Sequence, residues 1–530
     1  MIKRDLKGKF DTVLEFSDWR YSASAVGLMR YFEEMGFVEG DDYSKTYEEE
    51  HIIDGESEII IRNDVLCYNT KDILLDDEEN RKRYLDFVEK YFKSKMYHLG
   101  LKALIKKDTL SDEDVKSIND LMNSKAIMKK VFKEIDIDID SDKSTKKNVL
   151  NLMEKNRYNL IEEAYKNATA TYKKFCNQNS FGTVEGKVCR LVGYYVDLSK
   201  KKKSMAFNWD YNTYVYEDCP EFDYIPFAFS KTRDAFFINN NINAKELLKA
   251  NENLNNSLSI ENHVIDDNKS ARSALFLSSS KAAQFINYQV EIIIKNRDKD
   301  YFETMFVRDE AIDIFRKISG ENKLKESKKG YEYILMALNN PCIYGSKKLE
   351  KVQYLNISSI VVDSILNILR LDPLIDKLLK DRKENDHSFL ISQLIIINTY
   401  IYEKLIEIEI TYNFNKKDII MNSIDKKEYL DMNEIKDINN STRGAAYAAA
   451  SIMEKNKVTG YRNKLISCLT FKDYDRFCTV LLQLSAYSKI NFVFAYKLFE
   501  DFEKNKNLAY IFVNSFVKDE KKEKKEKKEV

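Results

Sequence analysis

The chain has 530 residues, and its 86 Lys and Arg balance its 86 Asp and Glu, so the formal net charge is zero. That balance excludes a uniformly basic protein that coats nucleic acid, although it permits a local basic groove because affinity for phosphate follows the local field. With 44% hydrophobic residues and only 14 Gly and 4 Pro, the composition excludes disordered and collagen-like classes and favours a globular, mostly helical chain.

The first predicted elements are a helix and a β-hairpin. Apolar residues recur at helical spacing from Ala25 to Phe32, and Gly36 is placed to end that helix. Two apolar runs at 52–53 and 58–62 are separated by Asp54-Gly55, which is a strong hairpin signal. Residues 84–180 then follow a helical pattern of apolar positions.

The middle of the chain predicts strands, and the last third predicts helices. Aromatic and β-branched residues with Gly and Pro between them predict short strands within 184–230, including one at 224–229, and a strand pair at 291–295 and 301–307. Residues 349–517 are helical in pattern, with Ser441-Thr442 as a plausible helix cap. We therefore predict an α+β fold: a mixed amino-terminal region with short antiparallel strands over 1–345, a carboxy-terminal all-helical bundle over 346–517 and a charged disordered tail over 518–530.

Cysteine usage and the apolar stretches predict the compartment. The seven cysteines are scattered and odd in number, which predicts free thiols in a reducing cytoplasm. Residues 1–10 lack the apolar core of a signal peptide. The most apolar stretch, 391–410, contains too many polar residues to span a bilayer and predicts a buried helix. We expect a cytoplasmic protein without a membrane partner.

Basic residues beside aromatic ones give the first candidate nucleic-acid-binding site. Four consecutive lysines, Lys200, Lys201, Lys202 and Lys203, lie just before an aromatic segment that contains Trp209. Lysines next to exposed rings suit phosphate contact combined with base stacking. A solvated charged turn explains the same run, so both interpretations stay open.

Asparagines and isolated basic residues give further candidates. An Asn side chain offers a donor and an acceptor to base edges, which makes the Asn-rich stretch a candidate reader of bases, although a plain polar loop explains it equally. Its candidate residues are Asn239, Asn240 and Asn241. Four more residues are candidates for phosphate contact by their charge alone: Arg272, Lys281, Arg443 and Arg462.

The metal-ligating and nucleophilic side chains form no complete site in the sequence. Cys176 and Cys219 each keep one half of a Cys-x-x-Cys pair, with Cys189 between them, whereas a structural zinc site needs four ligands. The four His have no metal-type pairing, and no Ser or Cys has a base nearby in the sequence. We predict no metal site, no cofactor and no catalytic residues.

The order of these features resembles a known family. The features that carry the resemblance are Asp18-Trp19, Ala25-Val26-Gly27-Leu28, the hairpin at 52–62, Phe87, Tyr91-Phe92, the broken cysteine pairs around Asn208-Trp209, Ile225-Pro226-Phe227-Ala228-Phe229, Arg443-Gly444, Lys464-Leu465 and Phe477 with Leu481-Leu482. The chain resembles the large subunit of type I-B CRISPR Cascade effector complexes, in the family named for a CXXC-CXXC region. The resemblance covers most of residues 10–517 and fails at the missing cysteines, which puts the family's zinc in doubt.

The resemblance implies a non-enzymatic function. A large subunit of this kind binds the crRNA-guided complex with its backbone, crRNA-end and small subunits, recognises the protospacer-adjacent motif on target double-stranded DNA, and recruits the helicase-nuclease. In RNA-guided recognition, base pairing reads the sequence while the protein reads a short motif and the backbone.

Two alternative functions and a second translation product of the same gene stay open at this point. A metal-dependent nuclease of antiviral defence whose carboxylates are distant in sequence is one alternative, and a helical scaffold without nucleic acid is the other. In type I-B systems, a small subunit is made by internal translation of the large-subunit gene, and Met421 and Met432 lie in a polar stretch ahead of the carboxy-terminal helices. Either could start such a product here.

Overall fold

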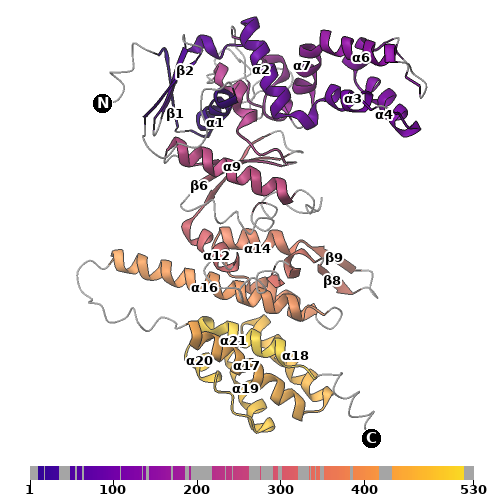
Figure 1. The fold of residues 1–530 in the computed structure, drawn as a ribbon. Helices are drawn as coiled ribbons and strands as arrows, with labels where there is room; N and C mark the ends of the chain where they lie inside the picture. The colour runs from indigo at the N-terminus through magenta and orange to yellow at the C-terminus, as the bar shows by residue number, and fades with distance from the viewer. Residues whose placement is uncertain are drawn as a thin grey trace, which may run out of the picture. The chain divides into compact units, whose positions relative to one another are not determined.

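The computed structural model describes the chain as an α+β protein, as predicted, with many helices and a few short antiparallel strands (Figure 1). It divides into two compact units, one formed by Met1–Val264 with Gln289–Val307 and the other by Ile265–Tyr288 with Arg308–Val530. The structure describes residues 10–518 except for 17, 35–47, 54–56, 63–64, 108, 134, 136, 139–142, 169–170, 185–189, 193–217, 233, 241–242, 262–274, 276–289, 297–300, 320–332, 335, 341, 347–350, 382–385 and 417–431.

The predicted hairpin is confirmed and belongs to a four-stranded antiparallel sheet. Strands β2 (Glu48–Ile53) and β3 (Ser57–Arg62) pair in the register His51 with Ile59. They are extended by β4 (Val65–Tyr68) and β1 (Thr12–Glu15), in the spatial order β1-β4-β3-β2. The predicted tail at 518–530 lies outside the described residues except for Lys518.

Helix α1 (Trp19–Glu34) lies at the centre of the first unit, in agreement with the predicted helix. It is buried along nearly its whole length. It packs against η5 (Pro220–Phe227), a buried 3₁₀ segment. The strand predicted at 224–229 is therefore wrong. Pro220 and Pro226 lack the backbone N–H groups that a strand ladder uses, and side chains all around the segment face the core.

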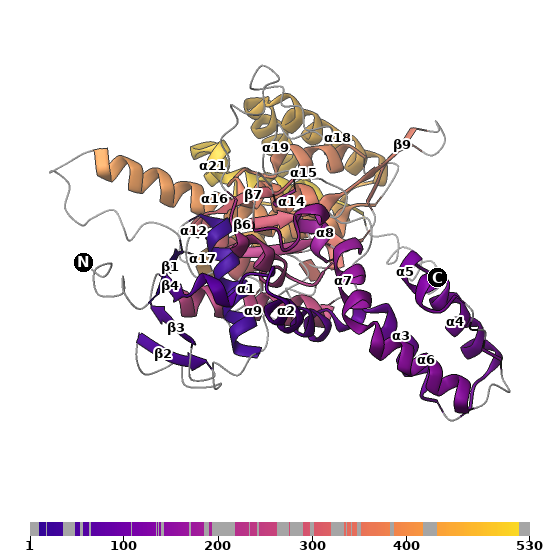
Figure 2. The ribbon, with the colours of Figure 1, turned by 90° about the horizontal axis from the view of Figure 1, so that it is seen from above.

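Helices predicted over 84–180 are confirmed and form two clusters. Helices α2 (Glu78–Tyr91), α7 (Arg157–Asn167) and α8 (Tyr172–Phe175) join the core around α1. Three short 3₁₀ turns, η1 (Thr70–Asp72), η2 (Lys93–Lys95) and η3 (Gln178–Ser180), lie in the connecting segments. Helices α3 (Tyr97–Ile105), α4 (Asp112–Met122), α5 (Ala126–Val131) and α6 (Lys143–Lys155) enclose a second small core. Figure 2 shows α3, α4 and α6 side by side, away from the β1–β4 sheet.

The predicted strand pair is also confirmed. Strand β6 (Val290–Lys295) pairs with β7 (Glu303–Val307) on one side and with β5 (Ala235–Asn239) on the other, all antiparallel. Helix α9 (Ala244–Glu261) packs on β5.

The second unit mixes helices with one hairpin. Helices α12 (Asp309–Ser319), α14 (Ile357–Leu366) and α15 (Asp372–Asp381) accompany the strands β8 (Cys342–Ser346) and β9 (Lys351–Leu355). The prediction of helix from 349 onward is wrong at β9, where the alternating sequence Lys-Val-Gln-Tyr-Leu forms a strand. The predicted boundary between residues 345 and 346 falls inside β8, and the limits of independently folding domains stay a prediction.

Helix α16 (Ser388–Lys416) is the apolar helix predicted at 391–410. In contrast to the expectation that its polar residues exclude a membrane span, its segment Ser388–Ile408 could cross a membrane by length and composition, and 50% of that apolar window is buried inside the fold. The core helix of a globular protein has the same properties. Ile391, Leu394 and Ile397 are fully buried within the second unit.

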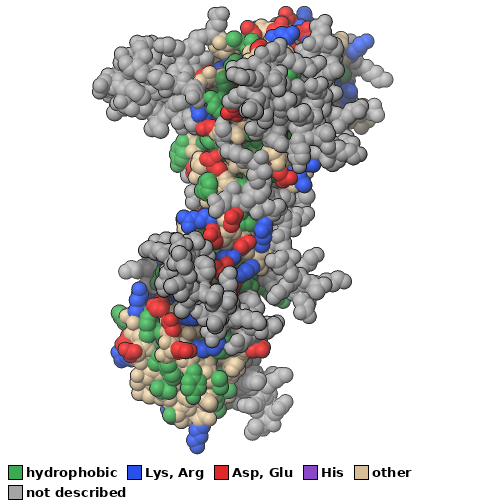
Figure 3. All heavy atoms as spheres, turned by 90° about the vertical axis from the view of Figure 1, so that its left-hand side faces the viewer, with side chains coloured by type: hydrophobic (Ala, Val, Ile, Leu, Met, Phe, Trp, Pro, Cys, Tyr) green, Lys and Arg blue, Asp and Glu red, His purple; other side chains and the backbone are tan. Residues whose placement is uncertain are grey.

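The carboxy-terminal helices form a bundle, as their amphipathic pattern predicted. They are α17 (Met432–Ile452), α18 (Lys455–Phe471), α19 (Tyr474–Ser488), α20 (Ala495–Glu500) and α21 (Phe502–Ser515). The predicted cap at Ser441-Thr442 is wrong, because α17 continues through it and the Thr442 hydroxyl donates to the Ile438 carbonyl one turn back, at 2.7 Å. On the face drawn in Figure 3, hydrophobic side chains gather over these helices. The solvent-exposed apolar residues of the carboxy-terminal region include Leu482, Val493 and Tyr496.

Candidate nucleic-acid interface

Much of the predicted nucleic-acid-binding set cannot be placed. Lys200, Lys201, Lys202, Lys203, Trp209, Asn241, Arg272 and Lys281 lie outside the described residues. Their contact with nucleic acid stays a prediction.

Asn239 and Asn240 are placed, and both are buried. Their side chains are 5% and 3% exposed. The Asn239 amide donates to Glu291 Oε2 across the β5–β6 pair at 2.8 Å, and the Asn240 amide donates to the Glu246 carbonyl at 3.1 Å. Neither amide is presented to solvent, so this geometry gives both residues a structural role at the end of β5.

Arg443 and Arg462 both lie in the carboxy-terminal bundle and are half-buried. Arg443 lies on α17, donates to Asn440 Oδ1 at 3.5 Å, and lies one turn before the exposed Tyr447. Arg462 lies on α18 and donates from Nε to the Val513 carbonyl at 3.0 Å, so part of its donor capacity ties α18 to α21.

Helix α18 carries a surface that the sequence analysis missed. Between residues 455 and 471 there are four basic residues and no acidic one. Lys457, Tyr461 and Lys464 recur at helical spacing, so they share one face of the helix. The absence of acidic residues from 455–471 could have been recognised in the sequence, because it leaves these lysines without carboxylates on their own helix.

The turn between α18 and α19 completes this surface. Lys472 ends α18 in the left-handed conformation, and the Asp473 carboxylate caps α19 by accepting from the Arg476 N–H at 3.1 Å. The chain thus reverses, and Tyr487 near the end of α19 comes to lie beside the first turns of α18. We call Lys457, Tyr461, Lys464 and Tyr487 the tyrosine–lysine patch.

The patch alternates cations and aromatic rings. The Lys457 ammonium donates to the Tyr487 hydroxyl at 2.7 Å, and this hydrogen bond raises the pKa of Lys457, so the group stays charged. The Tyr461 and Tyr487 rings have centroids 6.3 Å apart. The Lys464 ammonium lies 5.6 Å from the Tyr461 ring centroid. Tyr487 is 48% exposed, so its ring is open to a stacking partner. Two rings and two ammonium groups suit a flexible nucleic-acid strand, with bases on the rings and phosphates on the lysines.

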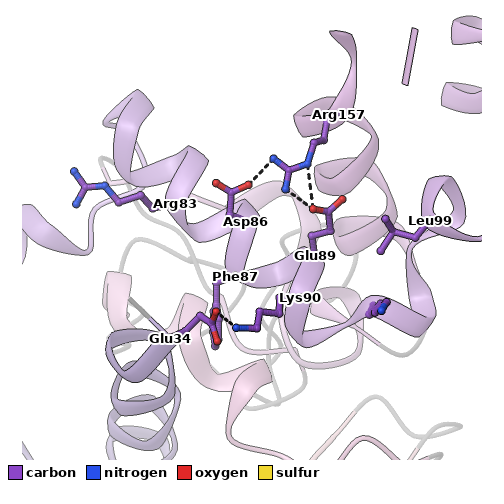
Figure 4. A pocket seen from close by; sticks show the side chains of 9 residues that line it. Glu34, Arg83, Asp86, Phe87, Glu89, Lys90, Leu99 and Arg157 are labelled. Atoms are coloured by element: carbon purple, nitrogen blue, oxygen red, sulfur yellow. Dashed lines mark hydrogen bonds and ion pairs between the residues drawn. The ribbon is translucent and has the colours of Figure 1, made fainter. Parts of the chain in front are cut away.

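A hollow of about 460 Å³ in the first unit is lined mainly by charged groups (Figure 4). Its charges largely satisfy one another. Arg157 binds Asp86 at 2.7 Å and also Glu89, and Lys90 binds Glu34. A lining that neutralises itself in this way offers little net attraction to a charged ligand.

In the second unit, a cysteine, a histidine and an aspartate side chain form a row of neighbouring groups. Cys342 Sγ lies 4.0 Å from His387 Nδ1, and His387 Nε2 lies 2.9 Å from Asp381 Oδ2. A cysteine nucleophile needs a thiolate and an open approach. Burial raises the pKa of Cys342 to about 11, and the residue is 4% exposed. The Cys342, His387 and Asp381 side chains therefore do not support a catalytic role. Among the described residues, no group of three or more His, Cys, Asp and Glu side chains could hold a metal ion.

Comparison with known protein families gives a match. The family model of CRISPR-associated protein Csx8 matches residues 10–516, which is nearly the whole chain. No curated protein and no solved structure matches the chain.

Proposed function

The chain belongs to the family of CRISPR-associated protein Csx8, and from this premise we propose that it is the non-catalytic large subunit of a type I-B CRISPR interference complex. In this function it binds the crRNA-guided complex, recognises the protospacer-adjacent motif on target double-stranded DNA and recruits the helicase-nuclease. Family membership over residues 10–516 supports the antiviral role and carries the proposal.

The tyrosine–lysine patch supports a contact with nucleic acid. A subunit of an RNA-guided complex meets single strands whenever the target duplex opens. Exposed rings with lysines between them hold such strands without reading their sequence, because every base has a face that can stack. The patch therefore suits a strand-holding role, while motif reading falls to other residues.

The neutral net charge and the exposed apolar side chains support docking onto other subunits. A zero net charge creates no general repulsion or attraction, so contact with nucleic acid depends on local groups. Exposed apolar residues on α19, on α20 and in the turn between them, including Leu482, Tyr496 and Val493, are typical of surfaces that contact proteins.

The experiment compares the complex with and without this chain. Complexes purified from the native operon, complete or lacking the chain, are titrated against target duplexes that keep or lack the flanking motif. We expect the complete complex to prefer the duplex with the motif and the incomplete complex to lose this preference. Equal preference in both would contradict the proposed role. Magnesium-dependent cleavage of DNA by the purified chain alone would instead favour a nuclease.

A further inference from the structure

The two cysteines left from the CXXC-CXXC pattern do not fit a zinc site. Zinc binds thiolates, with four ligands around the ion. Cys176 is fully buried and its thiol donates to the Phe222 carbonyl at 3.6 Å. Among the described residues, no group of three or more His, Cys, Asp and Glu side chains could hold a metal ion at either cysteine. The described residues therefore do not assemble four ligands around Cys176 or Cys219, and we derive no role for zinc from these cysteines.

A buried arginine occupies the region between the two cysteines. Arg190 is 2% exposed. Its guanidinium donates from Nη1 to Asp218 Oδ2 at 2.5 Å, from Nε to Asp223 Oδ1 at 3.2 Å, and from Nη2 to the Thr183 carbonyl. Its backbone N–H donates to the other Asp218 oxygen at 3.0 Å. Both carboxylates are themselves nearly inaccessible, so these are fully desolvated pairs.

The same cluster joins three segments of the chain. Asp223 also accepts from the Tyr172 hydroxyl at 2.5 Å and from the Gly182 N–H at 3.2 Å. Beside it, Cys176 and Leu191 form an antiparallel bridge, and the Asn177 N–H donates to the Arg190 carbonyl at 2.7 Å. Segments 172–183, 190–192 and 218–223 are thus held at one point by a single positive centre.

We propose that Arg190, Asp218 and Asp223 form a metal-independent clasp that closes this region in place of a zinc ion. A zinc ion cross-links a small region by placing a positive charge among ligands from separate segments. The planar guanidinium does the same with three donors in fixed directions. Arg190 and Asp218, which the clasp joins, flank segment 191–217 in the sequence, and that segment contains Lys200–Lys203 and Trp209. A role of that segment at nucleic acid rests on the proposed function, whereas the clasp does not.

The test uses the full chain and measures metal content and thermal unfolding, so it is independent of nucleic-acid binding. The clasp predicts less than one zinc per ten chains by elemental analysis and an unchanged unfolding temperature in a strong zinc chelator. Arg190→Met leaves two buried carboxylates without their counter-charge and should lower the unfolding temperature by roughly 10 °C. The matched control Arg83→Met removes a partly exposed arginine of α2 that pairs with Glu79 one turn earlier, and it should lower the unfolding temperature by less than about 2 °C.

Two milder variants keep the test decisive if Arg190→Met fails to fold. Arg190→Lys retains the charge but cannot reach all three acceptors, so it should lower the unfolding temperature by an intermediate amount. Cys219→Ala should shift it far less than Arg190→Lys, because no metal ligand is lost. Stoichiometric zinc, a large shift in chelator, or a larger loss from Cys219→Ala than from Arg190→Lys would overturn the clasp.

Discussion

Removing the two lysines of the tyrosine–lysine patch should change the salt dependence of single-strand binding. The ammonium groups of Lys457 and Lys464 stand on one face of α18, a helix without acidic residues. Each phosphate contact to a single strand contributes about 0.7 to the slope of log affinity against log salt, so Lys457→Ala with Lys464→Ala should lower that slope by about 1.4. The loss should be independent of base sequence, because lysine contacts to phosphate carry no sequence information.

The assay is fluorescence anisotropy of a labelled oligonucleotide with the purified full chain across a salt series. The matched control is Lys129→Ala with Lys130→Ala, which removes two exposed lysines from α5 in the other unit. Substituting Ala for Tyr461 and Tyr487 should weaken binding about tenfold or more at every salt concentration with little change of slope, since stacking contributes about 1–3 kcal/mol for each base. An unchanged slope in the Lys457 and Lys464 variant, or an equal change in the control, would refute the assignment of the patch.

Three further outcomes follow from the structure. Gly27→Ala should destabilise the first unit by roughly 2–4 kcal/mol in denaturant unfolding, because its Cβ would lie 2.1 Å from the Tyr224 carbonyl oxygen; Gly100→Ala, with open space around it, should be neutral or stabilising. Burial raises the pKa of Asp376 to about 6, so the folded state binds the proton of this carboxyl more tightly than the unfolded state does. The free energy of unfolding should therefore rise by about 1 kcal/mol as the pH falls from about 7 to about 5. Asp376→Asn should remove that rise, and a pH profile identical to that of the unchanged chain would contradict this prediction. If an internal start is used, mass spectrometry of the native complex should find a fragment that begins near Met421 or near Met432, where α17 starts, and ends at Val530; absence of any such fragment would argue against it.

Local sequence patterns predicted a hairpin and an amphipathic helix. The hairpin of β2 and β3 follows from Asp54-Gly55 between apolar runs, and α19 follows from an apolar stripe with a charged opposite face. Such patterns did not identify η5. Segment η5 is buried on all sides, so its sequence shows no period that would separate a 3₁₀ turn from a strand.

The candidate site was less predictable, because its parts meet only in the fold. Lys457 and Tyr487 are 30 positions apart in sequence, and only the reversal at Lys472 and Asp473 brings them together. Burial also made one of the predicted binding residues inaccessible. Asn239 appeared to be a free polar side chain in an Asn-rich stretch, yet it pairs with Glu291 on the neighbouring strand. A composition-based choice of residues cannot detect either effect.

The central claim is that the chain works as a subunit of an RNA-guided complex. The most direct measurement is to purify the tagged chain from its native operon and to sequence the RNA that elutes with it. We expect RNA of uniform length with repeat-derived ends, in a fixed ratio to the chain and to several co-purifying proteins. A chain that elutes alone and free of such RNA, from cells that express the whole operon, would contradict the claim.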